Sequence, residues 1–451
     1  MILRTRLVVV CSVLSLSACA MPPARAPLRV PRSGAAAIAR SLADEVGPRL
    51  AGSPGDARAV AWALARMRAM GFSNVRAEPV IVPHWVRGEG EGEVLEPAAQ
   101  RVNLAALGGS VATPEEGIEA EVLEVPSIDV LEAAAPERVA GRIVFIHQVM
   151  RRTADGSGYG EAVRARTRGP SIAAAKGAVA VIVRSIGTDR SRLPHTGALR
   201  YADDAPRVPA AALSVADAEL LHRLGARGPV RFRLRLTCRA EADAESANVV
   251  GELPGTDRAR EIVLLGAHLD AWDLGRGALD DGAGVAIALE SARLAAQGDP
   301  LRRTVRVVLF ANEENGLAGA RAYAAAHAGE LADHVVALEA DAGDGRVREV
   351  AFNGGAEAAR AFDDLAARLA PLGVRRSAEL AWGGADLSTL AGVPRIGLEQ
   401  DMSRYFDVHH TANDVPEAID RRALDHAVRV WREVVGTLAR SDAPLGRARA
   451  R

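Results

Sequence analysis

The chain has 451 residues, about three times the ~150 residues of a single domain, so we expect more than one folding unit. Hydrophobic residues make up 49% of it and charged residues 25%, as in soluble globular proteins, which argues against a disordered chain and against a multi-span membrane protein. The formal net charge of -1 creates no long-range field of one sign, which argues against nucleic acid as a partner and favours small or neutral ligands.

The first 18 residues have the pattern of a secretory signal peptide. Arg4 and Arg6 precede the apolar run LVVVCSVLSLSA, which is too short for a transmembrane helix of ~20 apolar residues. The run ends in LSAC, which resembles the bacterial lipobox and implies cleavage before Cys19 and a diacylglycerol on its thiol. Residues 19–33, rich in Pro and Ala, would then be a tether. Cleavage without lipidation is the alternative.

Cysteine usage agrees with export. Of the three cysteines, Cys11 lies in the signal peptide, Cys19 would carry the lipid, and Cys238 remains. The mature chain therefore cannot form an internal disulfide. We expect a lipoprotein of the cell envelope, attached to a membrane through its lipid alone, or a secreted protein.

Residues 34–117 are expected to form the N-terminal part of the main domain. Apolar residues have helical spacing over 34–70, interrupted by the loop GPRLAGSPG at 47–55, and the strand-like VRAEPVIVP follows. Helix, loop, helix and strand is the simplest interpretation.

Residues 118–245 differ from the preceding segment in having short strand-like runs and loops, and are expected to form an inserted, smaller β-rich domain. Short strands are expected at IEAEVLEV, GRIVFIHQ, AVAVIVRS and RFRLRLT, with an amphipathic helix around 216–224. From 246 to 440, apolar strands alternate with Ala-rich helices, which predicts an α/β fold: a doubly wound, mostly parallel sheet flanked by helices. Residues 441–451 form a C-terminal tail.

Imidazole and carboxylate side chains follow several of these strands where each strand ends, the edge at which a doubly wound sheet opens its ligand crevice. They are His268 and Asp270 after EIVLLGA, Asp280 and Asp281 in GRGALDDGAG, Glu313 and Glu314 after VRVVLFAN, Asp341 after VVALEA, and His409, His410 and Asp414 in YFDVHHTAND. One of the two adjacent aspartates is expected to cap the following helix. A mixture of imidazole nitrogen and carboxylate oxygen donors suits a pair of zinc ions. Structural zinc sites are typically rich in Cys, whereas this set of ligands has no thiolate and leaves coordination positions open for water, as in catalytic sites.

The motifs HLDAWDLGRGALDDGAG, NEENG, LEADAG and HHTAND, in this order, resemble the co-catalytic zinc exopeptidases of the aminopeptidase type, and most of all the carboxypeptidase Q branch. The resemblance implies two zinc ions per chain, one on His268 and Asp341 and the other on Glu314 and His410, with Asp280 bridging them.

The same resemblance implies further roles around the metal ligands. Asp270 would orient His268, Glu313 would be the general base, and the peptide bond between Asp280 and Asp281 would be cis. The nucleophile would be a hydroxide that bridges the zinc ions. Tyr405 could donate to the oxyanion or simply pack in the core. His409 is expected to be a structural neighbour of His410.

The middle region resembles a protease-associated domain in its strand order and in IAAAKGAVAVIV, although a generic insertion would look similar. Because none of the expected ligands lies in it, we expect it to be dispensable for metal binding and to shape substrate access. His327 and His334 are expected at the surface.

The resemblance implies hydrolysis of short peptides or unblocked dipeptides, and a homodimer. An aminopeptidase or other amidohydrolase on this fold remains an open alternative. The full set of ligands for two metal ions argues against a glutaminyl cyclase, which would use one zinc ion, and against a non-enzymatic binder, which usually lacks metal-ligating residues. Which end of the peptide is read is left open by the motifs.

Overall fold

The computed structural model describes residues 33–448. The expected signal peptide, Cys19 and all of the tether except Ser33 lie outside the described residues. Among residues 33–448, no helix is both long and apolar enough to cross a membrane.

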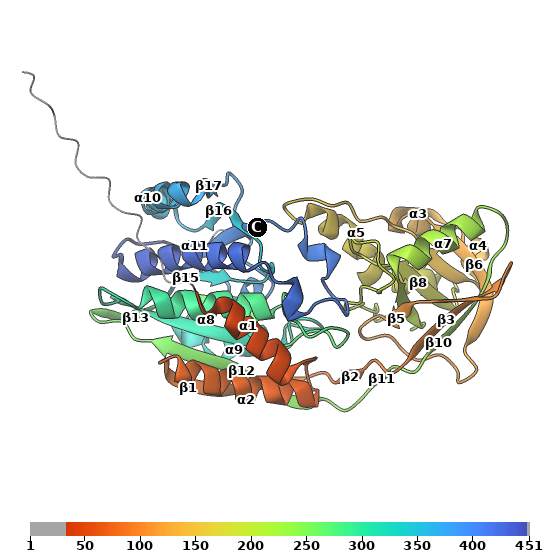
Figure 1. Cartoon of the computed structure of the whole chain (residues 1–451), viewed down its shortest axis with the longest axis horizontal. Helices are drawn as coiled ribbons and strands as arrows, with labels where there is room; N and C mark the ends of the chain where they lie inside the picture. Colours follow the sequence, from red (N-terminus) through yellow and green to blue (C-terminus); the bar gives the residue numbers. More distant parts are fainter. Residues whose placement is uncertain (1–32, 449–451) are drawn as a thin grey trace, which may run out of the picture. The chain divides into compact units, whose positions relative to one another are not determined.

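The first of two eight-stranded sheets is built from strands within residues 73–82 and 244–400 (Figure 1). In spatial order its strands are β1 (Ser73–Val82), β12 (Ala244–Leu253), β14 (Arg303–Phe310), β13 (Arg258–His268), β15 (His334–Glu339), β18 (Arg395–Gln400), β16 (Val347–Asn353) and β17 (Arg375–Arg376). The central strands β14, β13, β15 and β18 are mutually parallel, which confirms the expected arrangement, while β1, β12 and β16 pair antiparallel towards the edges.

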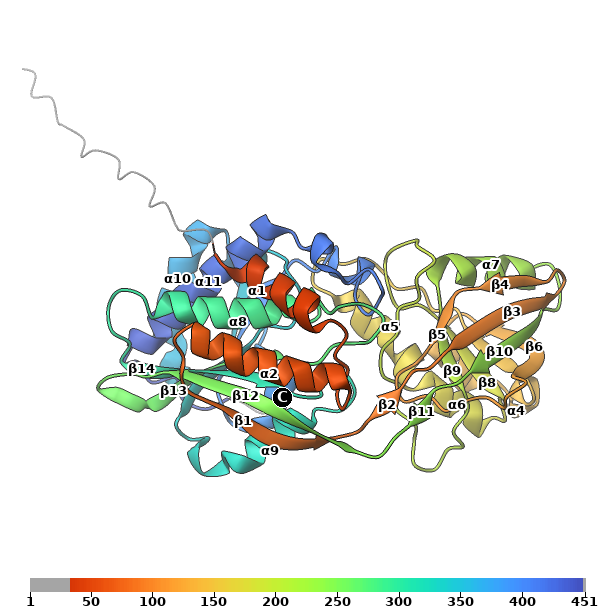
Figure 2. The same cartoon turned by 60° about the horizontal axis from the view of Figure 1, so that its bottom comes forward.

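Helices cover both faces of this sheet. The helices outside the insert are α1 (Ala35–Ser41), η1 (Leu42–Val46), α2 (Pro54–Ala69), α8 (Gly282–Ala295), α9 (Ala318–Ala326), η2 (Ala328–Glu330), η3 (Ala356–Ala358), α10 (Ala359–Leu369), η4 (Ala370–Leu372), η5 (Asp386–Thr389), η6 (Tyr405–Asp407), η7 (Pro416–Ala418) and α11 (Arg421–Arg440). Along β13, Val263 and Leu265 join the core under α1, α2, α8 and α11, whereas Ile262 and Leu264 pack with α9 on the opposite face (Figure 2). Burial on both faces explains the unbroken apolar sequence of this strand.

The second sheet belongs to residues 87–238, here called the insert. Its strands, in spatial order, are β4 (Gln100–Val102), β3 (Gly90–Glu96), β10 (Arg231–Leu236), β6 (Ile118–Val125), β7 (Ile143–Ile146), β8 (Ala180–Arg184), β9 (Ala210–Leu213) and β5 (Leu104–Ala106). Its helices are α3 (Ile128–Ala133), α4 (Pro136–Val139), α5 (Ser157–Thr167), α6 (Gly169–Ala175) and α7 (Val215–Gly225). The chain enters and leaves through the paired strands β2 (Trp85–Val86) and β11 (Arg239–Ala240).

The insert begins earlier than the sequence suggested. The strands between residues 90 and 106, expected to belong with the main domain, hydrogen bond into the second sheet through β10 and β9. Such long-range pairing leaves no local signal in the sequence, because β3 pairs with a strand more than 130 residues later.

Most local expectations are confirmed. The loop at 47–55 separates α1 and η1 from α2, and the Ser53 hydroxyl caps α2 by accepting the Asp56 N–H group. The surface position expected for His334 is wrong. This side chain is 1% exposed because the residue begins the buried strand β15, and Nε2 lies 2.9 Å from the Tyr323 hydroxyl.

Candidate active site

The expected metal-ligating side chains meet at one edge of the first sheet. The parallel strand β13 ends at His268, β14 ends shortly before Glu314, and β15 ends shortly before Asp341. The carboxyl ends of parallel strands form the crevice of a doubly wound sheet. The loop after β18 brings His410 to the same place, within reach of Glu314.

Asp280 lies between two histidines that come from distant segments. Its Oδ1 is 3.2 Å from Nε2 of His268, and its Oδ2 is 3.2 Å from Nε2 of His410. Each histidine faces one further carboxylate: Asp341 Oδ1 is 3.6 Å from His268 Nε2, and Glu314 Oε2 is 3.1 Å from His410 Nε2. The five side chains therefore form two adjoining groups that share the carboxylate of Asp280.

Both histidines are held in the tautomer that leaves Nε2 free to bind a metal. Nδ1–H of His268 donates to the backbone oxygen of Asp270 at 3.0 Å, and Nδ1–H of His410 donates to that of Thr196 at 3.1 Å. In neutral histidines of this tautomer, the Nε2 lone pairs would point at carboxylate oxygens. Protons or metal cations must therefore lie between them.

The electrostatics of the site favour bound cations. Burial would lower the pKa of His410, but Glu314 and Asp280 raise it to about 10. Burial raises the pKa of Glu314, and it raises that of Glu313 well above the usual value. A buried group of carboxylates of this size is stable only with compensating positive charge. The donor set thus fits two divalent cations that share Asp280.

Glu313 and Glu314 differ in their surroundings. Glu314 Oε1 accepts the Trp272 N–H group at 3.3 Å while Oε2 faces His410. This side chain therefore belongs to one of the two groups that share Asp280. Among the described residues, Glu313 is in none of the groups that could hold a metal ion. Asn312, just before the pair, has φ 63°, a left-handed conformation that a non-glycine residue adopts at a cost and that is common near functional sites.

Asp270 acts through different atoms than expected. Its backbone oxygen, rather than its carboxylate, accepts the hydrogen bond from His268, and its Oδ1 is 3.7 Å from that ring. The carboxylate instead accepts the N–H groups of Glu313 at 3.0 Å and Glu314 at 3.3 Å. Asp270 therefore fixes both the imidazole and the turn that presents the two glutamates.

Asp281 is the helix cap that the sequence predicted. Its carboxylate accepts the N–H group of Gly284, in the first turn of α8, at 3.0 Å, and that of His268 at 3.1 Å. The peptide bond between Asp280 and Asp281 is cis, as expected. The adjacent aspartates thus have separate tasks, one facing the histidines and one holding the helix and the end of β13.

His409 is closer to the site than expected. Its ring stacks on that of His410 with centroids 3.6 Å apart, and its Nε2 lies 3.5 Å from Asp280 Oδ2. Burial and the charge of His410 lower the pKa of His409 well below its usual value, so it stays neutral. Tyr405 is buried, with its ring 5.0 Å from that of His409, and burial followed by nearby carboxylates raises its pKa well above the usual value. The phenol therefore keeps its proton.

Two residues that support the site were not assigned these roles from the sequence. Arg49, in the loop GPRLAGSPG, is fully buried and donates to the backbone oxygens of Leu269, Arg276 and Gly277. Asp414 accepts the N–H groups of Leu279 and Asp280 at 2.7 and 3.2 Å. The position of Arg49 in a Gly- and Pro-rich loop was the available signal, but its partners lie about 220 residues away.

Beside Asp280, Glu314 and His410 lies a cavity of about 10 Å³, which is also lined by Trp272 and Asp414. This is close to the volume that one water molecule or ion needs. The site is thus compact and shaped around a very small species.

Known proteins share both the sequence and the fold. The model of Peptidase family M28 matches residues 248–435. Carboxypeptidase Q of Mus musculus is 35% identical over 411 residues, which cover 90% of this chain and 86% of that protein. Carboxypeptidase Q of Homo sapiens is 35% identical over 412 residues, which cover 90% and 85%.

Solved structures of peptidases have a similar fold. A peptidase M28 precursor from Shewanella amazonensis SB2B superposes with a TM-score of 0.91 at 41% identity, covering 92% of this chain and 95% of that one. The zinc aminopeptidase BSAP from Bacillus subtilis has the same fold, with a TM-score of 0.64 at 21% identity and coverage of 90% and 95%. The chain therefore belongs to peptidase family M28 and is a metallopeptidase.

Proposed function

We propose that this protein is an exported exopeptidase that uses two zinc ions to hydrolyse short peptides. The observation that carries the proposal is the position of Asp280, whose two oxygens each lie 3.2 Å from the Nε2 atom of a different histidine. One carboxylate between two imidazole groups fits a bridging ligand, and imidazole with carboxylate is a donor set that suits zinc. His268 and Asp341 would hold one ion, and Glu314 and His410 the other.

Bound zinc would supply Lewis acidity that lowers the pKa of water and polarises the scissile carbonyl. The chain's own groups then do the rest. Glu313, close to the metal ligands but outside their groups, would accept the proton of the attacking water and pass it to the leaving amine. Tyr405, whose buried phenol keeps its proton, would donate a hydrogen bond to the oxyanion. Asp270 would keep Glu313 in place through the Glu313 N–H group.

The proposed substrate class is based on the relatives of this chain. Carboxypeptidase Q proteins match over nearly the whole chain, while a Bacillus subtilis aminopeptidase matches at 25% identity over 62% of it. We therefore favour short peptides with a free C-terminus, with aminopeptidase activity as the alternative. The insert would shape access to the site.

A dipeptide panel tests this function. Each dipeptide is offered free, N-acetylated or C-amidated, to protein as purified, after chelation, and after chelation followed by zinc. The proposal expects release of free amino acids that chelation abolishes and zinc restores, with about two zinc ions per chain by elemental analysis. Cleavage of C-amidated but not N-acetylated dipeptides would identify an aminopeptidase instead. Unchanged hydrolysis after complete zinc removal would overturn the zinc mechanism.

We also propose that Cys19 becomes the lipidated N-terminus of the mature protein, because LSAC follows directly after the apolar run. Mass spectrometry of the mature N-terminus should find an acylated Cys19, and a Cys19→Ala form should be released from the membrane fraction. An unmodified N-terminus at any other residue would overturn this part of the proposal without affecting the peptidase activity.

A further inference from the structure

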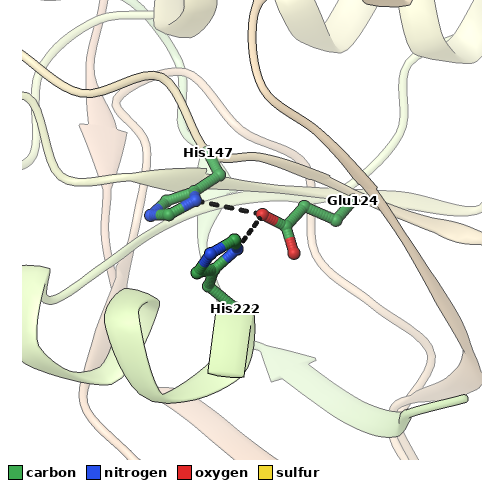
Figure 3. Close-up of side chains that lie close together, drawn as sticks. All are labelled: Glu124, His147 and His222. Atoms are coloured by element: carbon green, nitrogen blue, oxygen red, sulfur yellow. Dashed lines mark hydrogen bonds and ion pairs between the residues drawn. The ribbon is translucent and has the colours of Figure 1, made fainter. Parts of the chain in front are cut away.

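A second group of metal-ligating side chains lies in the insert and shares no residue with the candidate active site. Glu124 is near the end of β6, His147 follows β7 directly, and His222 is in the last turn of α7. Oε1 of Glu124 lies 3.0 Å from Nδ1 of His147 and 2.6 Å from Nδ1 of His222 (Figure 3). One carboxylate oxygen therefore faces two imidazole nitrogens, and the ring centroids of the two histidines are 4.6 Å apart.

Glu219 and Arg184 lie on the far side of the His147 ring from Glu124. Nε2 of His147 is 3.4 Å from Oε1 of Glu219, and Arg184 donates to the same oxygen at 3.3 Å. Partial burial would raise the pKa of Glu219, but the hydrogen bond from Arg184 and the charge of Arg184 lower it, so Glu219 is a carboxylate. Phe145 stacks on the ring at 5.3 Å. A carboxylate that holds the far nitrogen of an imidazole is the usual outer partner of a metal-binding histidine.

When the ring proton of His147 is on Nε2, facing Glu219, the Nδ1 lone pair points towards an oxygen of Glu124. Two lone pairs facing each other at 3.0 Å repel, so either a proton or a metal cation lies between them. The exposed His222 presents its Nδ1 to the same oxygen. A cation with two nitrogen ligands and one oxygen ligand would satisfy all three side chains at once.

We propose that Glu124, His147 and His222 bind a divalent transition metal ion at a site separate from the active site. One atom from each residue lies within 4.8 Å of the others. Tetrahedral zinc, with ligands at ~2.0–2.2 Å, needs its ligand atoms about 3.3 Å apart, so only small shifts are required. His147 is held by Glu219 and is 9% exposed, whereas His222 is 48% exposed and can adjust.

The chemistry of the site limits what it binds. Two imidazoles and one carboxylate favour zinc, nickel or copper over calcium or magnesium, which prefer oxygen ligands alone. Three protein ligands leave a coordination position for water or for a group from another molecule. The bound ion would connect the ends of the paired strands β6 and β7 to α7.

Metal stoichiometry tests the proposal on the whole mature protein. Wild type, His222→Ala and Glu124→Gln are stripped with a chelator, dialysed against a low-micromolar zinc buffer, and analysed for zinc per chain. Wild type should hold one ion more than either variant, whatever the active site binds, and dipeptide hydrolysis should be the same in all three. Arg223→Ala, an exposed change in the same helix, is the control and should bind as wild type does.

Two further measurements locate the bound ion at these residues. Zinc should slow amide hydrogen exchange in α7 of the wild type and not in His222→Ala, and the Cu²⁺-loaded wild type should show coupling to more ring nitrogens than this variant. Equal zinc content in wild type and variants would overturn the proposal. Binding to the wild type only at millimolar zinc would overturn it as well.

Discussion

The Nδ1–H group of His410 donates a hydrogen bond to the backbone oxygen of Thr196, and the Thr196 N–H group donates to the backbone oxygen of His410. His410 is an expected metal ligand, and Thr196 belongs to the insert. The insert therefore sets the tautomer of a residue at the candidate active site. Next to this pair, Nδ1–H of His195 donates to the backbone oxygen of His409 at 2.8 Å.

This contact argues against the expectation that the insert is dispensable for metal binding. None of the five expected ligands lies in it, but removing it would free the His410 ring to turn and to take the other tautomer. Partners of this outer kind fix ligand orientation and basicity. We therefore expect a clean deletion of the insert to weaken metal binding on the His410 and Glu314 side.

His195→Ala tests the contribution of the insert by a single change. His195 is 1% exposed and connects Asp189 at 2.8 Å to the His409 backbone, so its loss should loosen the segment that carries His410. We expect metal affinity and activity to fall by roughly 10–100-fold, the usual effect of removing such a partner. Zinc titration of the stripped protein, followed by kinetics at saturating zinc, would measure both.

Arg190→Ala is the control for that experiment, because Arg190 is exposed in the same loop. It should bind zinc as wild type does. Unchanged zinc affinity in a folded His195→Ala protein would show that the insert only covers the site.

The proximity of several expected site residues could be predicted because they follow parallel strands, whose carboxyl ends lie at one edge of the sheet. His268 and Asp341 are close together for this reason. The contribution of Thr196 could not be predicted in the same way. It acts through a backbone atom, so its side chain carries no signal, and its partner lies 214 residues away.

The role of Asp270 shows a second limit. Its spacing from His268 correctly indicated that the two act together, but an extended strand suggests that the carboxylate should face the imidazole. In the structure the chain turns after β13, so the carboxylate reaches the N–H groups of Glu313 and Glu314 instead. Spacing predicts proximity, while the atoms that make contact depend on where a strand ends.

Arg49→Ala should strongly destabilise the protein. The guanidinium group is fully buried and donates to the backbone oxygens of Leu269 at 2.6 Å, Arg276 at 2.7 Å and Gly277 at 2.8 Å. Its removal leaves three carbonyl groups, two of them in buried contacts, without these donors, and we expect a loss of about 3–5 kcal/mol in the free energy of unfolding. Urea unfolding would measure it. Arg68→Ala, an exposed change in α2, should cost less than about 0.5 kcal/mol.

Asp56 should make stability fall as the pH rises from about 4 to about 6. Burial raises the pKa of Asp56 to about 6, from an ordinary value of 3.8, although a hydrogen bond from the Gly52 N–H group opposes the shift. The folded state therefore binds a proton that the unfolded state has released in this window, and that stabilisation, about 3 kcal/mol, is lost above the folded pKa.

Asp56→Asn isolates this effect, because an amide oxygen can still accept the Gly52 N–H group. The difference in unfolding free energy between variant and wild type should change by up to about 3 kcal/mol between pH 4 and pH 7, with the variant the more stable at neutral pH. Parallel stability curves for the two proteins would contradict the assignment of a buried, partly protonated Asp56.

Glu313→Gln and Glu314→Ala should separate two adjacent acids of equal charge. Glu314 faces His410 at 3.1 Å, so Glu314→Ala removes a ligand and should lower the zinc content. Glu313 lies outside the groups that could hold a metal among the described residues, so Glu313→Gln should keep both ions. Its turnover should nevertheless fall by roughly 10²–10⁴-fold, the usual contribution of a positioned general base, with little change in KM.

The two variants are informative together because Asp270 holds the N–H groups of both residues, so neither change should disturb the turn that presents them. Elemental analysis and steady-state kinetics on the same preparations would separate loss of metal from loss of the base. Zinc added in excess should partly restore Glu314→Ala, whose defect is occupancy, and should leave Glu313→Gln unchanged, whose defect is proton transfer. If Glu313→Gln loses zinc while Glu314→Ala keeps two ions, the roles of the two glutamates are reversed.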